Sequence, residues 1–296
     1  MIAGSSLESD ALGFEVSDVD GLLRHAADNL IMPKYGALSD GEVKQKSSAT
    51  DLVTEVDLAV ESFLCEALKK IDPTAAFIGE ESAAADPTIV SALEREGRFW
   101  ILDPLDGTRN FVRGVDEFAT ILAFVENGVT KAGWISACPE KTVFSAFRGK
   151  GVQVDGADFS PQKQDAAPTL ERQHPLTGMK SLSWLSAEWR DRIKSNLDAH
   201  HKAVAGHCSA YAYLHLLRGD VDFKISSRIH PWDHLAGALM LDEMGGQVGF
   251  IDKPDEFDPY RPMDSVDRPL LAVAPGVSWR ETAQSLAGPS PERVTD

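Results

Sequence analysis

The chain has 296 residues, of which 43% are hydrophobic and 25% charged, and its formal net charge is −17. This composition is that of an ordinary globular protein, and its acidity argues against nucleic-acid and anionic-membrane partners, because binding to phosphate backbones relies on Lys and Arg. No apolar run approaches the roughly 18 residues of a membrane span, and the N-terminus lacks the basic and apolar regions of a signal peptide. Three widely spaced cysteines without metal-ligand spacing favour buried thiols in a reducing cytoplasm.

Helical patterns dominate the first hundred residues. Residues 15–32 carry apolar side chains at helical spacing, and Pro33 is expected to stop that helix. After a polar loop, residues 57–71 predict a second amphipathic helix, for which Asp57 is well placed as the N-cap. A short apolar piece, AAFIGEES, follows, and a polar helix is predicted over residues 87–96.

Strand signals begin at Phe99. The segments RFWIL, FATILAFVENG, KAGWISACP and KTVFSAFRGKG are separated by turn residues and predict an antiparallel meander. Residues 155–171, rich in Pro, Gln and Asp, resemble a connection between two halves, which we place at 1–150 and 151–296. The second half alternates helices and short strands, and its clearest helix, 233–244, is closed by two glycines. The expected class is mixed, α+β with α/β.

Acidic clusters stand at four element boundaries, and each alone has an ordinary explanation. They are DLVTEVD (51–57), GEES (79–82), DPLDGT (103–108) and PWD (231–233). An Asp before a helix is usually a cap, a GEE segment is usually a solvated turn, and DG is a hairpin signal. Taken singly, none of the four establishes a site.

The DPLDGT segment is the hardest to explain as a plain turn. The strand before it is expected to end at Leu102, Pro104 fixes one backbone angle, and Gly107 permits a sharp turn. If the segment folds back, Asp103 and Asp106 converge. The sequence therefore predicts two carboxylates that share one small volume.

Converging carboxylates need either a shared proton or a cation. A hard, oxygen-seeking ion such as Mg²⁺ makes the arrangement favourable, and the Leu105 carbonyl would add a further oxygen. Backbone amides at Gly107 and Thr108 would suit a phosphate oxygen if a helix begins there. The segment thus predicts a magnesium site next to a phosphate site.

Four motifs taken in order carry a family resemblance: DLVTEVD, FIGEES, WILDPLDGTRNF and PWDHLAGALMLDEMGG. With this order and spacing, from about Lys46 to Gly246, the sequence resembles the inositol monophosphatase family of metal-dependent, lithium-sensitive sugar-phosphate phosphatases. The resemblance implies a layered α-β-α-β-α sandwich with an N-terminal α+β half and a C-terminal α/β half. Members are commonly homodimers, so a homodimer is expected.

The resemblance implies a set of metal ligands. Glu80, Asp103 and the main-chain carbonyl of Leu105 match the ligands of a first Mg²⁺. Asp103, Asp106 and Asp233 match those of a second, so Asp103 would bridge the two ions. Some members hold a third, looser ion near Glu80. Two or three Mg²⁺ ions are therefore expected.

The resemblance also implies catalytic and substrate-binding residues. Asp57 and Thr108 match the pair that orients and deprotonates the attacking water, and Glu80 is the third candidate catalytic residue. Lys46 matches a lysine near the metal site of relatives. The candidate substrate contacts are Gly107, Thr108, Ser209, Ser226 and Asp233. The implied reaction is direct attack of a metal-activated water on phosphorus, without an aspartyl-phosphate.

Residues 206–230 depart from the family pattern. The sequence at 207–209 reads His-Cys-Ser, where many members have Gly-Ser-Ala or Gly-Thr-Ala. Ser226 stands where relatives acting on inositol phosphates often carry a glutamate that holds a substrate hydroxyl, and one hydroxyl does not replace a carboxylate in kind. Ser226, Ser227 and Arg228 would instead suit a second anionic or polar group.

The expected function is Mg²⁺-dependent hydrolysis of a small phosphorylated alcohol such as inositol monophosphate. Alternative substrates within the family are 3′-phosphonucleotides, histidinol phosphate and fructose 1,6-bisphosphate. A non-catalytic role as a metal-binding regulator is a more remote alternative.

Two other kinds of site are disfavoured. Haloacid dehalogenase phosphatases carry the motif DxDGT, but here two residues separate the aspartates. A histidine metal site is disfavoured, because Pro231 falls between His230 and His234, which alone have helical spacing.

Overall fold

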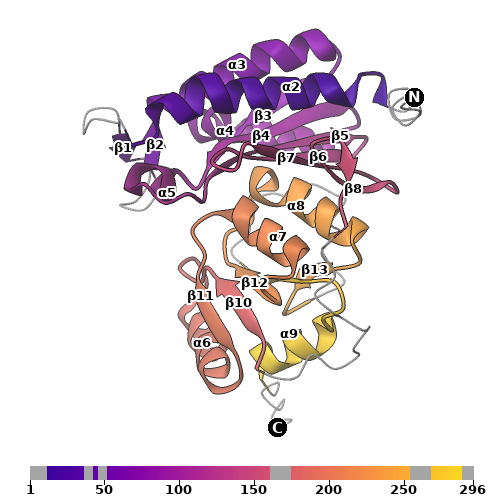
Figure 1. Ribbon diagram of the computed structural model, residues 1–296. Helices are drawn as coiled ribbons and strands as arrows, with labels where there is room; N and C mark the ends of the chain where they lie inside the picture. The colour runs from indigo at the N-terminus through magenta and orange to yellow at the C-terminus, as the bar shows by residue number, and fades with distance from the viewer. Residues whose placement is uncertain (1–11, 37–42, 46–51, 161–174, 254–267, 289–296) are drawn as a thin grey trace.

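Helices and sheets alternate in five layers in the computed structural model, which describes residues 12–36, 43–45, 52–160, 175–253 and 268–288 (Figure 1). Helices α2 (Val16–Ala26) and α3 (Glu55–Ile71) cover the outer face of the first sheet. Helices α7 (Ser209–Arg218) and α8 (Pro231–Glu243) lie between the two sheets, and α6 (Ala187–His200) and α9 (Trp279–Ala287) cover the second. The predicted α-β-α-β-α sandwich is confirmed.

The first sheet is the predicted meander with one strand added at one end and two at the other. Its order is β3-β4-β5-β6-β7-β8-β9, with β3 parallel to β4 and every other neighbouring pair antiparallel. The strands are β3 (Ala76–Gly79), β4 (Arg98–Asp106), β5 (Ala119–Glu126), β6 (Val129–Ala137), β7 (Thr142–Phe147), β8 (Gly151–Val154) and β9 (Ala157–Asp158). Strands β1 (Val43–Gln45) and β2 (Leu52–Thr54) form a separate antiparallel pair.

The second sheet has the order β11-β10-β12-β14-β13. Strand β10 runs parallel to both of its neighbours, whereas β14 runs antiparallel to β12 and β13. The strands are β10 (Thr177–Lys180), β11 (Lys202–Ala205), β12 (Phe223–Ser226), β13 (Gln247–Phe250) and β14 (Leu270–Val273). Because β10 and β12 are parallel neighbours, the loops that follow them leave the sheet at one edge.

Apolar packing between the layers explains the arrangement. Trp100, Phe124 and Trp134 fill the space between the first sheet and α2 and α3, and each is at most 1% exposed. Helix α8 lies between the two sheets and is apolar on almost every side, with ten of its 13 residues buried. Helices of that kind are buried from all directions, so α8 brings its first turn, with Asp233, against the end of β4.

Several predicted boundaries were wrong by a few residues. The helix predicted from Asp57 begins at Glu55, so Asp57 lies inside the first turn and is not the cap. The helix predicted over 87–96 is a 3-10 helix, Pro87–Glu94, preceded by α4 (Glu80–Ala85). Helix α8 begins at Pro231 rather than Asp233, because proline is favoured at the first helical position.

The first predicted helix has a composite form. α2 passes into a π segment, Ala27–Ile31, and a final 3-10 turn, Met32–Lys34, that contains Pro33. The division of the chain at residue 150 stays a prediction, and residues 161–171 of the proposed connection lie outside the described part of the chain. No helix among the described residues is long and apolar enough to cross a membrane.

Candidate functional site

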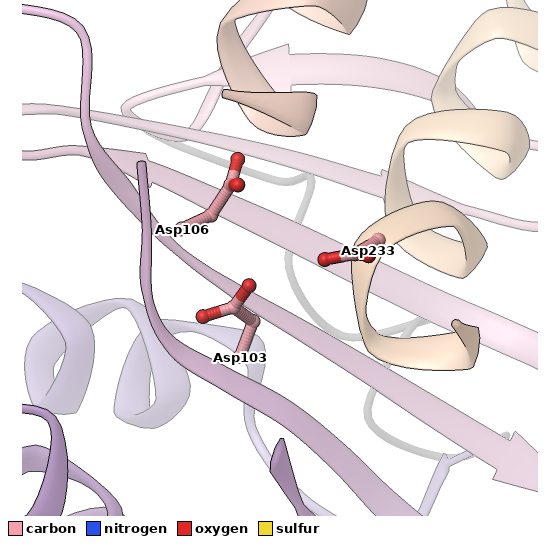
Figure 2. A group of neighbouring side chains, drawn as sticks. All are labelled: Asp103, Asp106 and Asp233. Atoms are coloured by element: carbon pink, nitrogen blue, oxygen red, sulfur yellow. The ribbon is translucent and has the colours of Figure 1, made fainter. Parts of the chain in front are cut away.

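Three aspartates from two distant parts of the chain converge in the structure (Figure 2). Asp103 and Asp106 belong to the end of β4, and Asp233 to the first turn of α8. One carboxylate oxygen from each lies within 4.8 Å of the others. We call these three residues the carboxylate cluster. Sequence analysis placed all three in one metal site.

The end of β4 is folded so that both of its aspartates face inward. The strand does not end at Leu102, as predicted, but continues to Asp106 with a shift in register between Asp103 and Asp106. Asp103 Oδ1 accepts a hydrogen bond of 3.0 Å from the Leu105 backbone N–H, and the irregularity re-aims the following side chains. Side chains three apart on a regular strand would point to opposite faces.

Gly107 makes the turn that follows. Its φ is +83°, in the left-handed region, and an added Cβ would lie 2.8 Å from the Glu117 carbonyl oxygen. Helix α5 (Thr108–Arg113) begins at the next residue. The predicted sharp turn is therefore confirmed, and the helix start on which the predicted phosphate site was conditional is present; both depend on a residue without a side chain.

The two predicted water-activating residues lie next to each other. Thr108 Oγ1 lies 3.3 Å from Asp57 Oδ1 and 2.9 Å from the Leu105 carbonyl oxygen. Asp57 is only 2% exposed, on the buried face of α3. A hydroxyl has one proton to donate and can also accept, so Thr108 can pass a proton to Asp57 while its oxygen accepts another.

Asp106 is held by the N-terminal turn of α7. Its Oδ2 accepts hydrogen bonds from the Ala210 backbone N–H at 2.6 Å and from the Cys208 thiol at 2.9 Å. Burial raises the pKa of Asp106, and these two hydrogen bonds oppose the rise. A helix N-terminus favours negative charge, so α7 fixes the carboxylate as an acceptor.

A buried lysine that sequence analysis missed accompanies the cluster. Lys224, in β12, is 5% exposed; its ammonium lies 4.2 Å from the centroid of the Tyr213 ring and 3.4 Å from Ser209 Oγ. Burial lowers the pKa of Lys224 to about 8, against the pull of the Asp233 and Asp106 carboxylates. The available signal was a lysine inside the short strand FKIS.

A second missed residue, Glu61 of α3, holds the segment that carries Glu80. Glu61 Oε2 accepts from the Glu81 backbone N–H at 2.9 Å, and Oε1 accepts from the Ser82 backbone N–H at 2.9 Å and from the Ser82 hydroxyl. A Cβ at Gly79 would lie 2.2 Å from Glu61 Oε2. The GEES motif therefore fits one buried glutamate, whose signal was its place on the apolar face of the predicted helix.

We expect Glu61→Gln to destabilise the fold. The amide keeps one acceptor oxygen but turns an NH₂ donor toward another N–H donor, which costs about 1–3 kcal/mol for a buried group. Glu66→Gln, exposed on the same helix, is the matched control. Urea unfolding of both variants measures the difference, and equal unfolding free energies would contradict the proposed cap.

The electrostatics of the cluster favour a cation. Burial, followed by the charges of Glu80 and Asp106, raises the pKa of Asp103 well above its usual range. Burial and the charges of Asp106 and Glu80 do the same to Asp233. Ionised together, these carboxylates repel one another unless positive charge joins them. An all-oxygen donor set of this kind fits a hard divalent cation.

The cluster opens onto a cleft of about 1320 Å³. Nine of the predicted site residues line it: Glu80, Asp103, Leu105, Asp106, Gly107, Thr108, Ser209, Ser226 and Asp233. Asp57 is not among the lining residues and reaches the cleft through Thr108. Lys46 lies outside the described part of the chain.

Both ring nitrogens of His234, one of the two histidines of the disfavoured metal site, make hydrogen bonds within the protein. His234 Nδ1 lies 3.0 Å from the Tyr213 hydroxyl, and Nε2 lies 3.3 Å from the Arg228 carbonyl oxygen. Burial lowers the pKa of His234 well below its usual range, so the ring is neutral. Nε2 then donates to Arg228, Nδ1 accepts from Tyr213, and the ring fixes the loop before α8.

Comparisons with known proteins identify the relatives of this chain. The profile of the inositol monophosphatase family matches residues 15–286. A histidinol-phosphatase of Mycobacterium tuberculosis is 32% identical over 78% of this chain and 85% of its own length. A fructose-1,6-bisphosphatase/inositol-1-monophosphatase of Thermotoga maritima is 29% identical over 81% of this chain and 84% of its own length. The extragenic suppressor protein suhB from Bartonella henselae shares the fold, with a TM-score of 0.73 and 22% identity over 91% of this chain and 97% of that one.

Proposed function

The chain belongs to the inositol monophosphatase family, and we propose that it hydrolyses a small phosphorylated alcohol with Mg²⁺ held by the carboxylate cluster. The family is metal-dependent, and the named relatives are phosphatases of small phosphorylated compounds, so the chain is a phosphoric monoester hydrolase. The observation that carries the proposal is the convergence of three carboxylates within 4.8 Å at the cleft.

The proposed metal ligands are those that the family motifs assign. Glu80, Asp103 and the Leu105 carbonyl would hold one Mg²⁺, and Asp103, Asp106 and Asp233 a second, with a third ion near Glu80 as the upper limit. When bound, such ions supply a water of lowered pKa and stabilise charge on phosphoryl oxygens. They would also turn the acidic carboxylate cluster into a site that attracts phosphate.

The proposed protein chemistry lies with neighbouring residues. Asp57 would take the proton of the Thr108 hydroxyl, so that the Thr108 oxygen can accept a proton from the attacking water. The backbone amides of Gly107 and Thr108 would hold the phosphate oxygens. Ser209, Ser226 and Asp233 would contact the alcohol part of the substrate.

Phosphate release from a panel of esters tests the proposal. We expect Mg²⁺-dependent release from at least one of inositol 1-phosphate, histidinol phosphate, fructose 1,6-bisphosphate and a 3′-phosphonucleotide, abolished by EDTA and restored by excess Mg²⁺. Ranking the four esters by kcat/KM decides between inositol 1-phosphate and the three alternative substrates. Release from none of them, with Mg²⁺ in excess, would favour the regulator and contradict the proposal.

Two wider expectations accompany the proposed function. The homodimer expected from the family stays a prediction, which light scattering of the purified chain tests directly. The cytoplasmic location and the absence of nucleic-acid partners also stay predictions, and they rest on composition and on the net charge of −17.

A further inference from the structure

The cleft is basic outside the carboxylate cluster, although the chain as a whole is acidic. Among the described residues, the Asp, Glu, Lys and Arg side chains that line the cleft are Glu80, Asp103, Asp106, Asp233, Arg109, Lys180, Lys224 and Arg228. The chain has 46 acidic residues against 29 Lys and Arg, so an equal division is an enrichment of basic side chains. All four acidic members belong to the proposed metal site, and once cations neutralise them the lining is positive.

Part of this positive charge belongs to a wall formed by the second sheet. Strands β10 and β12 are parallel neighbours, with Lys180 paired to Ile225, so their following loops lie side by side. The Trp184 backbone N–H donates to Ser227 Oγ at 3.4 Å and joins those two loops. We call Lys180, Trp184 and Arg228 the distal wall, and all three line the cleft.

Arg228 is pre-arranged within this wall. Its guanidinium carbon lies 4.5 Å from the centroid of the Trp184 ring, which is 41% exposed. His234 Nε2 donates a hydrogen bond to the Arg228 carbonyl oxygen and so fixes the backbone at Arg228. A guanidinium that stacks on an aromatic face is a group that binds carboxylates and phosphates bidentately through its N–H groups. An exposed tryptophan beside it offers a flat apolar surface to the carbon skeleton of a ligand.

We propose that the substrate is a phosphate monoester carrying a second anionic group, and that Arg228, supported by Lys180, binds that group. This inference rests on the proposed function and adds the substrate class. The cleft, about 1320 Å³, exceeds the roughly 300–1,000 Å³ of most small-ligand sites. It has room for a molecule that reaches from the cluster to the wall, and Ser226, beside them, adds no negative charge.

Two pairs of esters, each differing only in one anionic group, test the proposal. The first pair is 2-phosphoglycerate and glycerol 2-phosphate, and the second is 6-phosphogluconate and sorbitol 6-phosphate. In each pair the first ester has a carboxylate where the second has a CH₂OH group. The carboxylate lies close to the phosphate in the first pair and far from it in the second. We expect the carboxylate ester of at least one pair to have a kcat/KM at least about 10-fold higher than its neutral partner, the ratio expected from one hydrogen bond to a charged group.

Arg228→Gln should bring that ratio down toward one, mainly through a higher KM for the carboxylate ester. Lys180→Gln, a second variant at the wall, should lower it less. The control is Arg192→Gln, because Arg192 also lies over a tryptophan, Trp189, at 5.0 Å on α6 but does not line the cleft. Its ratio should match that of the unchanged chain.

The outcomes separate this inference from the function on which it rests. Phosphate release without preference in either pair, or a preference that survives in both wall variants, would overturn the inference alone. Release from no ester of these pairs or of the panel above would overturn the proposed function and the inference with it. If Arg228→Gln unfolds at a lower temperature than the unchanged chain, the Lys180→Gln ratio decides.

Discussion

Asp106→Asn is expected to lower Mg²⁺-dependent phosphate release by more than about 100-fold, since the partners that merely orient metal ligands are worth about 10- to 100-fold. Asparagine retains one carbonyl oxygen, which can still accept from the Ala210 backbone N–H that now bonds Asp106 Oδ2. It loses the charge that faces Asp103 and Asp233. The substitution therefore removes a cation ligand while leaving the contact to α7 in place.

Asp106→Asn should lose activity without losing stability in the absence of metal. Burial and mutual repulsion raise the pKa of Asp103 and Asp233, so one carboxylate fewer should leave the unfolding temperature in EDTA equal or higher. In Mg²⁺ the unchanged chain should gain stability, by about 2.7 kcal/mol at 100 times the dissociation constant. The variant should gain less.

Activity and thermal unfolding, each with and without Mg²⁺, check both parts. Asp198→Asn, exposed on α6 and away from the cleft, serves as the control and should behave like the unchanged chain. Unchanged turnover in Asp106→Asn would exclude the two-metal assignment. A lower unfolding temperature in EDTA would mean that lost activity reports lost folding.

Asp57→Asn is expected to lower kcat by about 10²- to 10⁴-fold, the range for loss of a positioned general base. The asparagine can accept a hydrogen bond from Thr108 Oγ1, now 3.3 Å away, but it cannot take the proton at neutral pH. KM should change little, because Asp57 does not line the cleft. Stabilisation by Mg²⁺ should persist.

A double-mutant cycle tests whether Asp57 and Thr108 act together or contribute independently to kcat. Thr108→Val should lower kcat as well, and the double variant should be about as slow as Asp57→Asn alone, because residues that act as a unit are not additive. Glu55→Gln, exposed in the same first turn of α3, is the control. Additive losses, or a loss confined to KM, would contradict a shared proton path.

Family membership, the layers and the motifs that carry the proposed metal ligands could be recognised in the sequence because their signals are local. Pro104 and Gly107 restrict the backbone within a few residues, so the turn after Asp106 could be inferred from DPLDGT alone. The strand boundary at Leu102 could not, because the register shift that carries β4 to Asp106 depends on pairing with β5. Likewise, Asp57 was misread as a cap, since helix starts are poorly fixed by sequence.

The contacts that support the site join residues far apart in the chain. Glu61 caps a helix 20 residues away, and Ala210 donates to a carboxylate at a separation of 104 residues. Lys224 lies in a strand that is covered by α7, and only that burial makes its charge consequential. Such partners are chosen by packing between layers, which no local pattern encodes.

The sequence by itself determined the reaction class, because each of the four family motifs is a short segment whose residue types and spacing carry its chemistry. Only the tertiary structure decided how those segments meet and what surrounds them: the Glu61 cap beneath GEES, the buried Lys224 and the distal wall. The physical reason is that the backbone conformation of a motif depends on a few neighbouring residues. The electrostatic interactions and burial of its side chains depend on residues that are close in space but distant in the sequence. Parallel pairing of β10 and β12 brings Trp184 beside Arg228.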